Sequence, residues 1–174
     1  MAQTNAAELP ATPLFGGVQD ADWPALLGTA TRVEMGANQP IFLQGEPADA
    51  FFVVLSGSAE VRSRVGDSQQ VLATLGSGAV LGETSLLLGG AHSASLYTAE
   101  ASILLRFPKA AFMAAIDDGQ HGAVRVLYNI AQALAIRLRA ADAHISELAQ
   151  ASSHGTVVKN DLDRLRNIFF SEWN

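Results

Sequence analysis

Residues 40–61 read PIFLQGEPADAFFVVLSGSAEV, and this stretch decides the fold. Two apolar runs, at 41–43 and 51–55, are each followed by a turn that contains glycine. The pattern continues with runs at 59–65 and 71–75, each again followed by glycine. Strands of about five residues at regular spacing, with turn residues between them, are typical of a β-sandwich or a small barrel. We therefore expect an antiparallel sheet structure between Arg32 and about Phe107.

Helical periodicity flanks this β region on both sides. Apolar positions between residues 12 and 30 recur at helical spacing, and Asp20 and Asp22 are possible N-caps. From Phe112 the helical period returns, and residues 123 to about 152 form the longest regular segment. The predicted fold class is mainly β with helices: a double-stranded β-helix, or jelly-roll barrel, flanked by short N-terminal helices and a long C-terminal helix. The predicted divisions are a flexible start (1–12), the barrel with its flanking helices (13–122), the long helix (123–153) and a short helical tail (154–174).

Apolar residues of the long helix step alternately by four and three positions, which is an unbroken a/d heptad pattern. Its members are Leu127, Ala131, Leu134, Leu138, Ala141, Ile145 and Leu148. One interpretation is a helix that packs on its own barrel. The other, which we favour, is a coiled coil that joins two copies of the chain through the 123–152 helix, with small alanines allowing close approach.

Composition excludes several classes of protein. Eleven Lys and Arg against seventeen Asp and Glu give a formal net charge of −6, which argues against binding of duplex DNA. The chain has no cysteine, hence no disulfide scaffold and no thiolate metal site. No apolar run approaches the ~20 residues of a membrane span, and no secretory leader is present, so we expect a cytoplasmic protein.

Enzymatic chemistry is also not expected. The four histidines show neither His-x-His nor His-x-x-x-His spacing, so no metal centre is predicted; they are His92, His121, His144 and His154. No Gly-x-Ser-x-Gly elbow and no Walker loop occurs. We expect a binding module that is not an enzyme and has no cofactor.

Four stretches, taken in order, resemble the cyclic-nucleotide-binding domain family, the sensor module of bacterial catabolite activators, kinase regulatory subunits and nucleotide-gated channels. They are residues 40–49, 51–61, 75–83 and 107–112, and the resemblance extends over residues 14–148. It implies a jelly-roll sensor domain that couples a bound nucleotide, such as cAMP or cGMP, to movement of the long helix.

The resemblance places the family's phosphate-binding cassette at residues 82–88. A turn followed by a short helix presents backbone N–H groups and a positive dipole end to phosphate. Gly82 lets the backbone approach a ligand closely, and Thr84 and Ser85 would offer N–H groups. The family pattern implies that Glu83 holds the ribose 2′-hydroxyl. We expect Leu86, Leu87 and Leu88 to face the core.

This sequence departs from the family where an arginine usually neutralises the cyclic phosphate. His92 stands there, followed by Ser93 and Ala94, and the positions of the family's base-contacting hydroxyls hold Ala141 and Asp142. Neutral imidazole offers one donor where guanidinium offers five, so affinity would fall about ten- to hundredfold. A bound phosphate could protonate the imidazole and make binding pH-dependent.

Three hypotheses follow. The first is a nucleotide sensor whose ligand-binding residues are Gly82, Glu83, Thr84, Ser85, His92, Ser93, Ala94 and Asp142. The second is a dimeric protein-interaction module that has lost its ligand, with Glu83 as a turn or capping residue and His92 in a surface loop. The third is a sensor of a cyclic dinucleotide such as cyclic di-GMP, with candidate cations Arg62, Arg64, Arg106, Arg137 and Arg139.

The residues after Ser152 are too few for the helix-turn-helix domain of the family's transcription regulators, so no DNA contact is expected. His154 and Gly155 give a plausible helix stop. A last helix is predicted over about 160–171, with the apolar residues Leu162, Leu165, Phe169, Phe170 and Trp173 in or beside it. This tail would either fold back on the body or anchor a protein partner.

Overall fold

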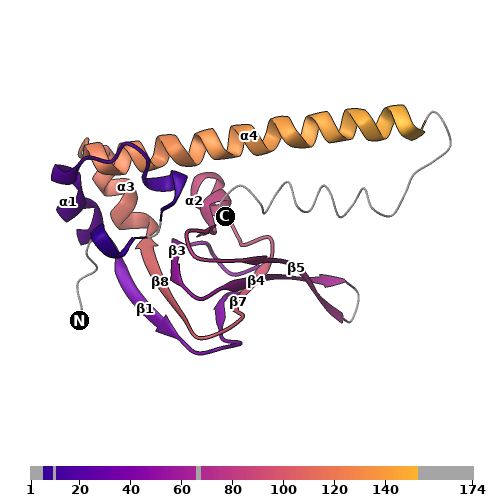
Figure 1. Cartoon of the computed structure of the whole chain (residues 1–174), viewed down its shortest axis with the longest axis horizontal. Coiled ribbons are helices and arrows are strands. Elements are labelled where there is room, and N and C mark those ends of the chain that lie inside the picture. The colour runs from indigo at the N-terminus through magenta and orange to yellow at the C-terminus, as the bar shows by residue number, and fades with distance from the viewer. Residues whose placement is uncertain (1–5, 10, 66–67, 153–174) are drawn as a thin grey trace.

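The computed structural model describes residues 6–9, 11–65 and 68–152, and its core is a pair of four-stranded antiparallel sheets (Figure 1). The first sheet has the order β1 (Thr31–Met35), β8 (Ser102–Pro108), β3 (Ala50–Ser56), β6 (Val80–Leu81). The second has the order β2 (Pro40–Phe42), β7 (Ser95–Thr98), β4 (Ala59–Val65), β5 (Ser68–Leu75). The predicted jelly-roll fold class is confirmed. The two sheets do not close into a barrel: among the described strands, no ladder joins one sheet to the other.

Three phenylalanines fix the first sheet to the helices. The rings of Phe51 in β3 and Phe107 in β8 stack with centroids 4.7 Å apart, as the pairing of these two residues across the ladder requires. Phe112 of α3 (Lys109–Asp117) meets the Phe51 ring edge-on at 5.0 Å. All three side chains are fully buried, so α3 is held by apolar area and by aromatic geometry together.

Short helices precede the sheets: η1 (Ala6–Glu8), η2 (Pro13–Phe15), η3 (Asp20–Asp22) and α1 (Trp23–Gly28). The last three lie between residues 12 and 30, where the sequence predicts helices, whereas η1 lies in the segment predicted to be a flexible start. The Asp22 carboxylate accepts a hydrogen bond from the Gln19 backbone N–H at 3.1 Å. It also lies 2.8 Å from Nδ1 of His121, the first residue of α4 (His121–Ser152). The hydrogen bond with His121 lowers the pKa of Asp22 below its usual value. Asp22 therefore joins the N-terminal segment to the start of the long helix.

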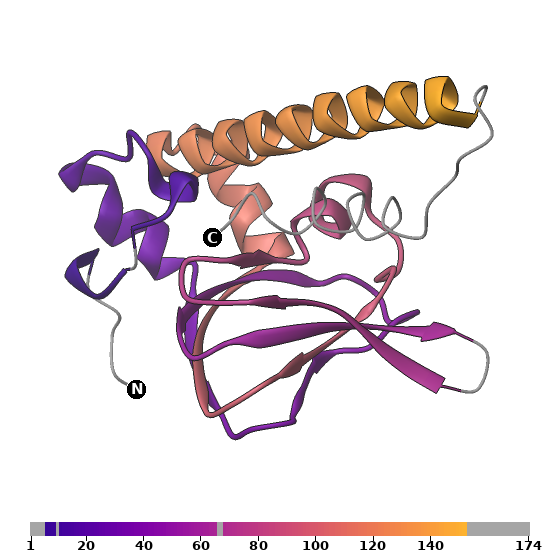
Figure 2. The ribbon, with the colours of Figure 1, turned by 45° about the vertical axis from the view of Figure 1, so that its right-hand side comes forward.

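Helix α4 is the long helix predicted over 123–152, and it lies above the sheets (Figure 2). One face packs on the body through Ala123, Val126, Ile130, Ala133, Arg137 and Ala141. The side-chain amide of Asn129 donates to the backbone carbonyls of Leu14, at 2.7 Å, and Gly16, at 2.9 Å. The first half of α4 and the N-terminal segment are thus one packed unit.

The predicted heptad seam straddles two faces of α4. Ala141 is buried and Leu134 packs against the core, whereas Ala131 and Leu138 are exposed. Outward-facing apolar positions also step by four and three, and we call them the outer stripe: Val124, Tyr128, Ala131, Ala135 and Leu138. The helix therefore packs on its own body along one face, while the dimer stays a prediction. The side chains of Ile145 and Leu148, and the tail 153–174, lie outside the described residues.

Candidate functional site

A cavity of about 110 Å³ lies between the second sheet, α2 (Glu83–Leu88) and α4. Seven of the eight predicted ligand-binding residues line it: Gly82, Glu83, Thr84, Ser85, His92, Ser93 and Ala94. The remaining wall is mostly apolar, from Phe42, Val61, Leu75, Val80, Leu81 and Leu96, with Arg137 from α4. The eighth predicted residue, Asp142, is exposed on α4 and is not among the residues that line this cavity.

Gly82 shapes the entry into α2. Its φ of +80° is left-handed, a conformation that glycine adopts without strain. A β-carbon at this position would lie 3.4 Å from Cε1 of Phe42 and 3.5 Å from Cε1 of His92. The Leu86 N–H closes the first helical turn on the Gly82 carbonyl at 3.1 Å, so the N–H groups of residues 83–85 have no acceptor within the helix. The positive end of α2 therefore borders the cavity.

An ion pair between α2 and α4 crosses one side of the cavity. Nη1 of Arg137 donates to Oε1 of Glu83 at 2.6 Å, and each side chain is only 8% exposed. Burying two charges so far out of water is costly, and their attraction to each other offsets part of that cost. Glu83, predicted to hold a ribose hydroxyl, is thus already engaged by a cation from the long helix.

From the sequence, Arg137 is only one of five candidate cations, and no direction toward the cavity is predicted for it. A usable pattern was present, since Arg137 continues the series Val126, Ile130, Ala133 toward Ala141, the buried stripe of α4. A charged residue within a buried apolar stripe indicates a partner across the interface. In the a/d heptad pattern, Arg137 lies outside the seam, so that pattern alone does not indicate that it is buried.

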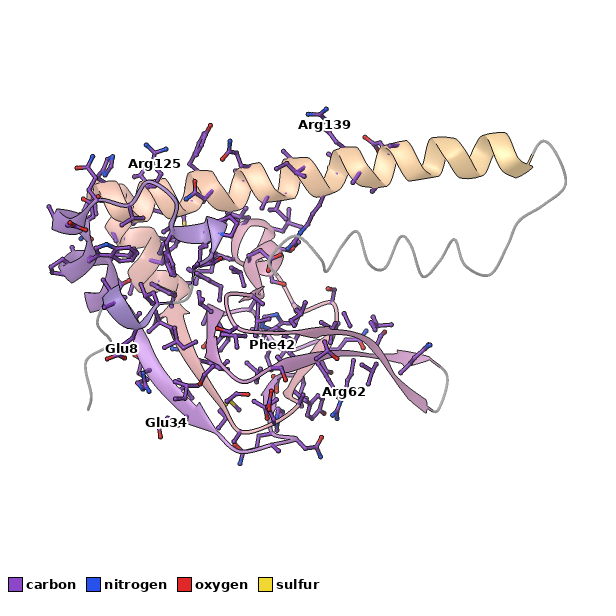
Figure 3. The ribbon with its side chains drawn as sticks, viewed as in Figure 1. Glu8, Glu34, Phe42, Arg62, Arg125 and Arg139 are labelled. Atoms are coloured by element: carbon purple, nitrogen blue, oxygen red, sulfur yellow. The ribbon has the colours of Figure 1, made fainter. Side chains whose placement is uncertain are left out.

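The other candidate cations have different roles. Arg62 pairs with Glu60 at 2.7 Å and lies over the Tyr97 ring, and Arg106 pairs with Asp49 at 2.8 Å. Figure 3 shows Arg139 projecting from α4 on the side away from the sheets. The side chain of Arg64 lies outside the described residues.

His92 is buried, so its interpretation as a surface-loop residue is wrong. It is 5% exposed, and its ring stacks on Phe42 with centroids 3.7 Å apart and planes 10° from parallel. Phe42 itself lies inside the sheets (Figure 3). Two backbone hydrogen bonds, to the Glu46 carbonyl and from the Gly45 N–H, both 2.9 Å, fix the position of residue 92.

Burial lowers the pKa of the His92 imidazole below its usual 6.5, although the nearby carboxylates of Glu46 and Asp49 act in the opposite direction. The ring is therefore neutral at pH 7 and supplies a single donor, as the sequence predicts for this position. His92 and Phe42 also line a second hollow, on the side of Glu46, Asp49 and Arg106. The stacked pair thus forms a wall shared by the two cavities.

The short helix α2 only partly matches its prediction. Leu86 is buried as expected, but Leu87 and Leu88 are exposed. A helix of six residues offers the core only one face, so consecutive leucines cannot all be covered by the same sheet.

A cavity formed by two jelly-roll sheets, with a short helix at its edge and a long helix above it, defines the class of this chain. The chain belongs to the cyclic nucleotide-binding domain family, whose model matches residues 32–118. It is 33% identical over 156 residues to the cyclic AMP receptor protein of Thermus thermophilus, covering 89% of this chain and 70% of that protein.

Two solved structures show the same fold. The catabolite activator protein of Thermus thermophilus superposes with a TM-score of 0.69 at 33% identity, over 79% of this chain and 63% of that one. The c-di-GMP responsive global regulator CLP of Xanthomonas campestris gives 0.61 at 25% identity, over 75% of this chain and 65% of that one. This chain therefore spans 63–70% of the length of these relatives.

In residues 6–9, 11–65 and 68–152, no helix is long and apolar enough to cross a membrane. The same described part contains no group of three or more His, Cys, Asp or Glu that could hold a metal ion.

Neutral, buried His92 makes stability pH-dependent in a defined direction. Because the folded-state pKa is lowered, the unfolded chain binds this proton more readily, and stability rises with pH between the folded value and about 6.5. Relative to His92→Gln, the wild type should lose free energy of unfolding as the pH falls below about 6.5, and the difference should be constant above pH 8. Urea unfolding from pH 5 to pH 9 measures this, and parallel pH profiles would contradict it.

Proposed function

We propose that this chain senses a cyclic nucleotide and reports its presence through the position of helix α4. The observation that carries the proposal is the buried Glu83–Arg137 ion pair, which joins the cassette helix α2 to the centre of α4 across the cavity. A ligand at α2 would meet a carboxylate and a guanidinium that belong to two different elements. The Glu83–Arg137 contact would then take part both in recognition of the ligand and in setting the position of α4.

Cavity size supports a coupled mechanism. About 110 Å³ is smaller than the roughly 300 Å³ at which ligand pockets of proteins begin. A nucleotide would fit after Arg137 and Glu83 separate, with the ribose hydroxyls donating to Glu83 and the guanidinium turning to the phosphate. The ligand would thereby select an arrangement in which α4 has moved, and its differential affinity would set the size of the shift.

His92 gives the proposed site its pH dependence. An anionic phosphate beside the ring would raise the imidazole pKa and favour the protonated form, so binding would take up a proton. Affinity should therefore increase as the pH falls, even though Arg137 supplies a cation that is charged at every pH of interest. Proton uptake would separate this site from a site whose phosphate is held by arginine alone.

Calorimetry with cAMP, cGMP and cyclic di-GMP at pH 6 and pH 8 tests the proposal. We expect binding of a cyclic mononucleotide, tighter at pH 6, and an increase of about tenfold or more at pH 8 in His92→Arg because the charged fork is restored. Gln132→Arg, at an exposed position of α4, controls for the added charge and should leave affinity unchanged.

The other outcomes separate the remaining hypotheses. Binding of cyclic di-GMP alone would replace the mononucleotide with a dinucleotide, the ligand to which the Xanthomonas campestris regulator responds. No heat from any of the three at millimolar concentration would overturn sensing and leave a protein-interaction module.

We propose further that two copies associate through the outer stripe of α4 and act on a protein partner and not on DNA. The five stripe positions are apolar and spaced as in a two-stranded coiled coil, and Ala131 and Ala135 allow close helix approach. The N-terminal segment covers a different side of α4, at Asn129, and leaves the stripe uncovered by that contact. A net charge of −6 favours a protein partner over nucleic acid.

A matched pair of substitutions tests the dimer. Leu138 and Ile136 are both exposed, by 62% and 49%, but they lie about 200° apart around the helix. Leu138→Glu should convert a dimer to monomer in sedimentation velocity at micromolar concentration, whereas Ile136→Glu should remain dimeric. A wild-type monomer, or a dimer that survives Leu138→Glu, would contradict the proposed interface.

A further inference from the structure

Two adjacent leucines of α2 form an uncovered apolar edge beside the cavity. Leu88 is 82% exposed, the highest value among the large apolar side chains of the described residues, and Leu87 is 40% exposed. Single exposed leucines are ordinary on protein surfaces. Here, however, both lie on the six-residue helix that carries Glu83, Thr84 and Ser85 to the cavity. We call Leu87 and Leu88 the α2 leucine patch.

The chain itself contains a segment of matching character. Residues 160–174 lie outside the described residues, and their sequence predicts a helix over about 160–171 with one apolar stripe. That stripe ends in an aromatic cluster formed by Phe169, Phe170 and Trp173. Large aromatic side chains gain most from apolar cover, so such a segment favours an apolar surface within its reach.

Chain length allows this cluster to reach α2. Arg137 contacts Glu83 at the start of α2, and α4 continues for another 15 residues to Ser152. Those residues extend about 22 Å at the helical rise. If residues 153–159 reverse the chain, a helix over 160–171 that runs back along α4 would cover about 18 Å. Figures 1 and 2 both show α2 on the sheet-facing side of α4.

Charge at the end of α2 agrees with this placement. The Lys109 ammonium lies next to Gly89, the residue that follows α2, 3.7 Å from where a β-carbon there would stand. In the tail, Glu172 lies between the aromatic residues Phe170 and Trp173. An aromatic cluster seated on the patch would bring a carboxylate to this lysine.

We propose that residues 160–173 dock in cis on the α2 leucine patch, with the aromatic cluster covering Leu87 and Leu88. The docked segment would then cover the exposed edge of the helix that carries Glu83 and Ser85 to the cavity. This docking does not depend on the identity, or the existence, of a nucleotide ligand. It also leaves the outer stripe of α4 available.

Because the chain contains no cysteine, a disulfide between two introduced cysteines has no competing native thiol. Leu88→Cys is paired in turn with Phe169→Cys, Phe170→Cys and Trp173→Cys, because a disulfide forms only where the Cα atoms approach to about 4.4–6.8 Å. The matched control replaces Leu88→Cys with Val71→Cys, an exposed apolar position on β5 (45%). We expect at least one Leu88 pair to form an intramolecular disulfide under mild oxidation, seen as a loss of two mass units in the intact monomer, and no Val71 pair to do so.

Two results would overturn docking in cis. The first is a disulfide that forms only between chains, which would assign the tail to a second copy. The second is that none of the three Leu88 pairs forms a disulfide, which would show that the tail does not contact Leu88. Equal trapping by Val71→Cys would show random collision and would overturn it too.

Trypsin gives a second readout without cysteines, since Arg164 and Arg166 lie within the segment. Leu88→Asn should accelerate cleavage there several-fold over the wild type, while Val71→Asn should not. Equal rates of cleavage in the wild type and Leu88→Asn would contradict docking of the segment on the α2 leucine patch.

Discussion

The buried ion pair between Glu83 and Arg137 is the contact on which the rest of the site depends. It joins residues 54 positions apart in the chain at 2.6 Å, with both side chains almost wholly removed from water. Such a pair gains little over apolar packing, yet the loss of one partner removes charge compensation from the other in a low-dielectric interior. Helix α2 and helix α4 are therefore not free to change position independently.

The other features of the site lie on either side of this ion pair. On one side, the Phe42–His92 stack and Gly82 define the wall of the cavity that α2 borders. On the other side, Asn129 and Asp22 bind the first half of α4 to the N-terminal segment, so movement at Arg137 would be taken up beyond that clamp. The outer stripe runs along the same helix. The proposed coupling between the cavity and a partner surface would follow this helix.

Local pattern in the sequence was enough to predict much of this. Turn residues between apolar runs predict strands β2 to β5, and helical periodicity predicts the long helix. A motif that is contiguous in the chain predicts the cavity residues at 82–85 and 92–94. What could not be predicted depends on contacts between distant segments. The partner of Glu83, the burial of His92 against Phe42, the exposure of Leu87 and Leu88, and the sharing of the α4 seam between two faces all arise when the sheets and helices pack.

A double-mutant cycle on the ion pair tests the central claim most directly. Glu83→Gln and Arg137→Met should each lower the free energy of unfolding by about 3–5 kcal/mol, because each removes one member of a buried ion pair. The double variant should recover at least about 1 kcal/mol of the summed loss, whereas Glu83→Gln combined with Arg139→Met should be additive. Additive losses for Glu83→Gln with Arg137→Met would show that the two helices are held together by something other than this pair.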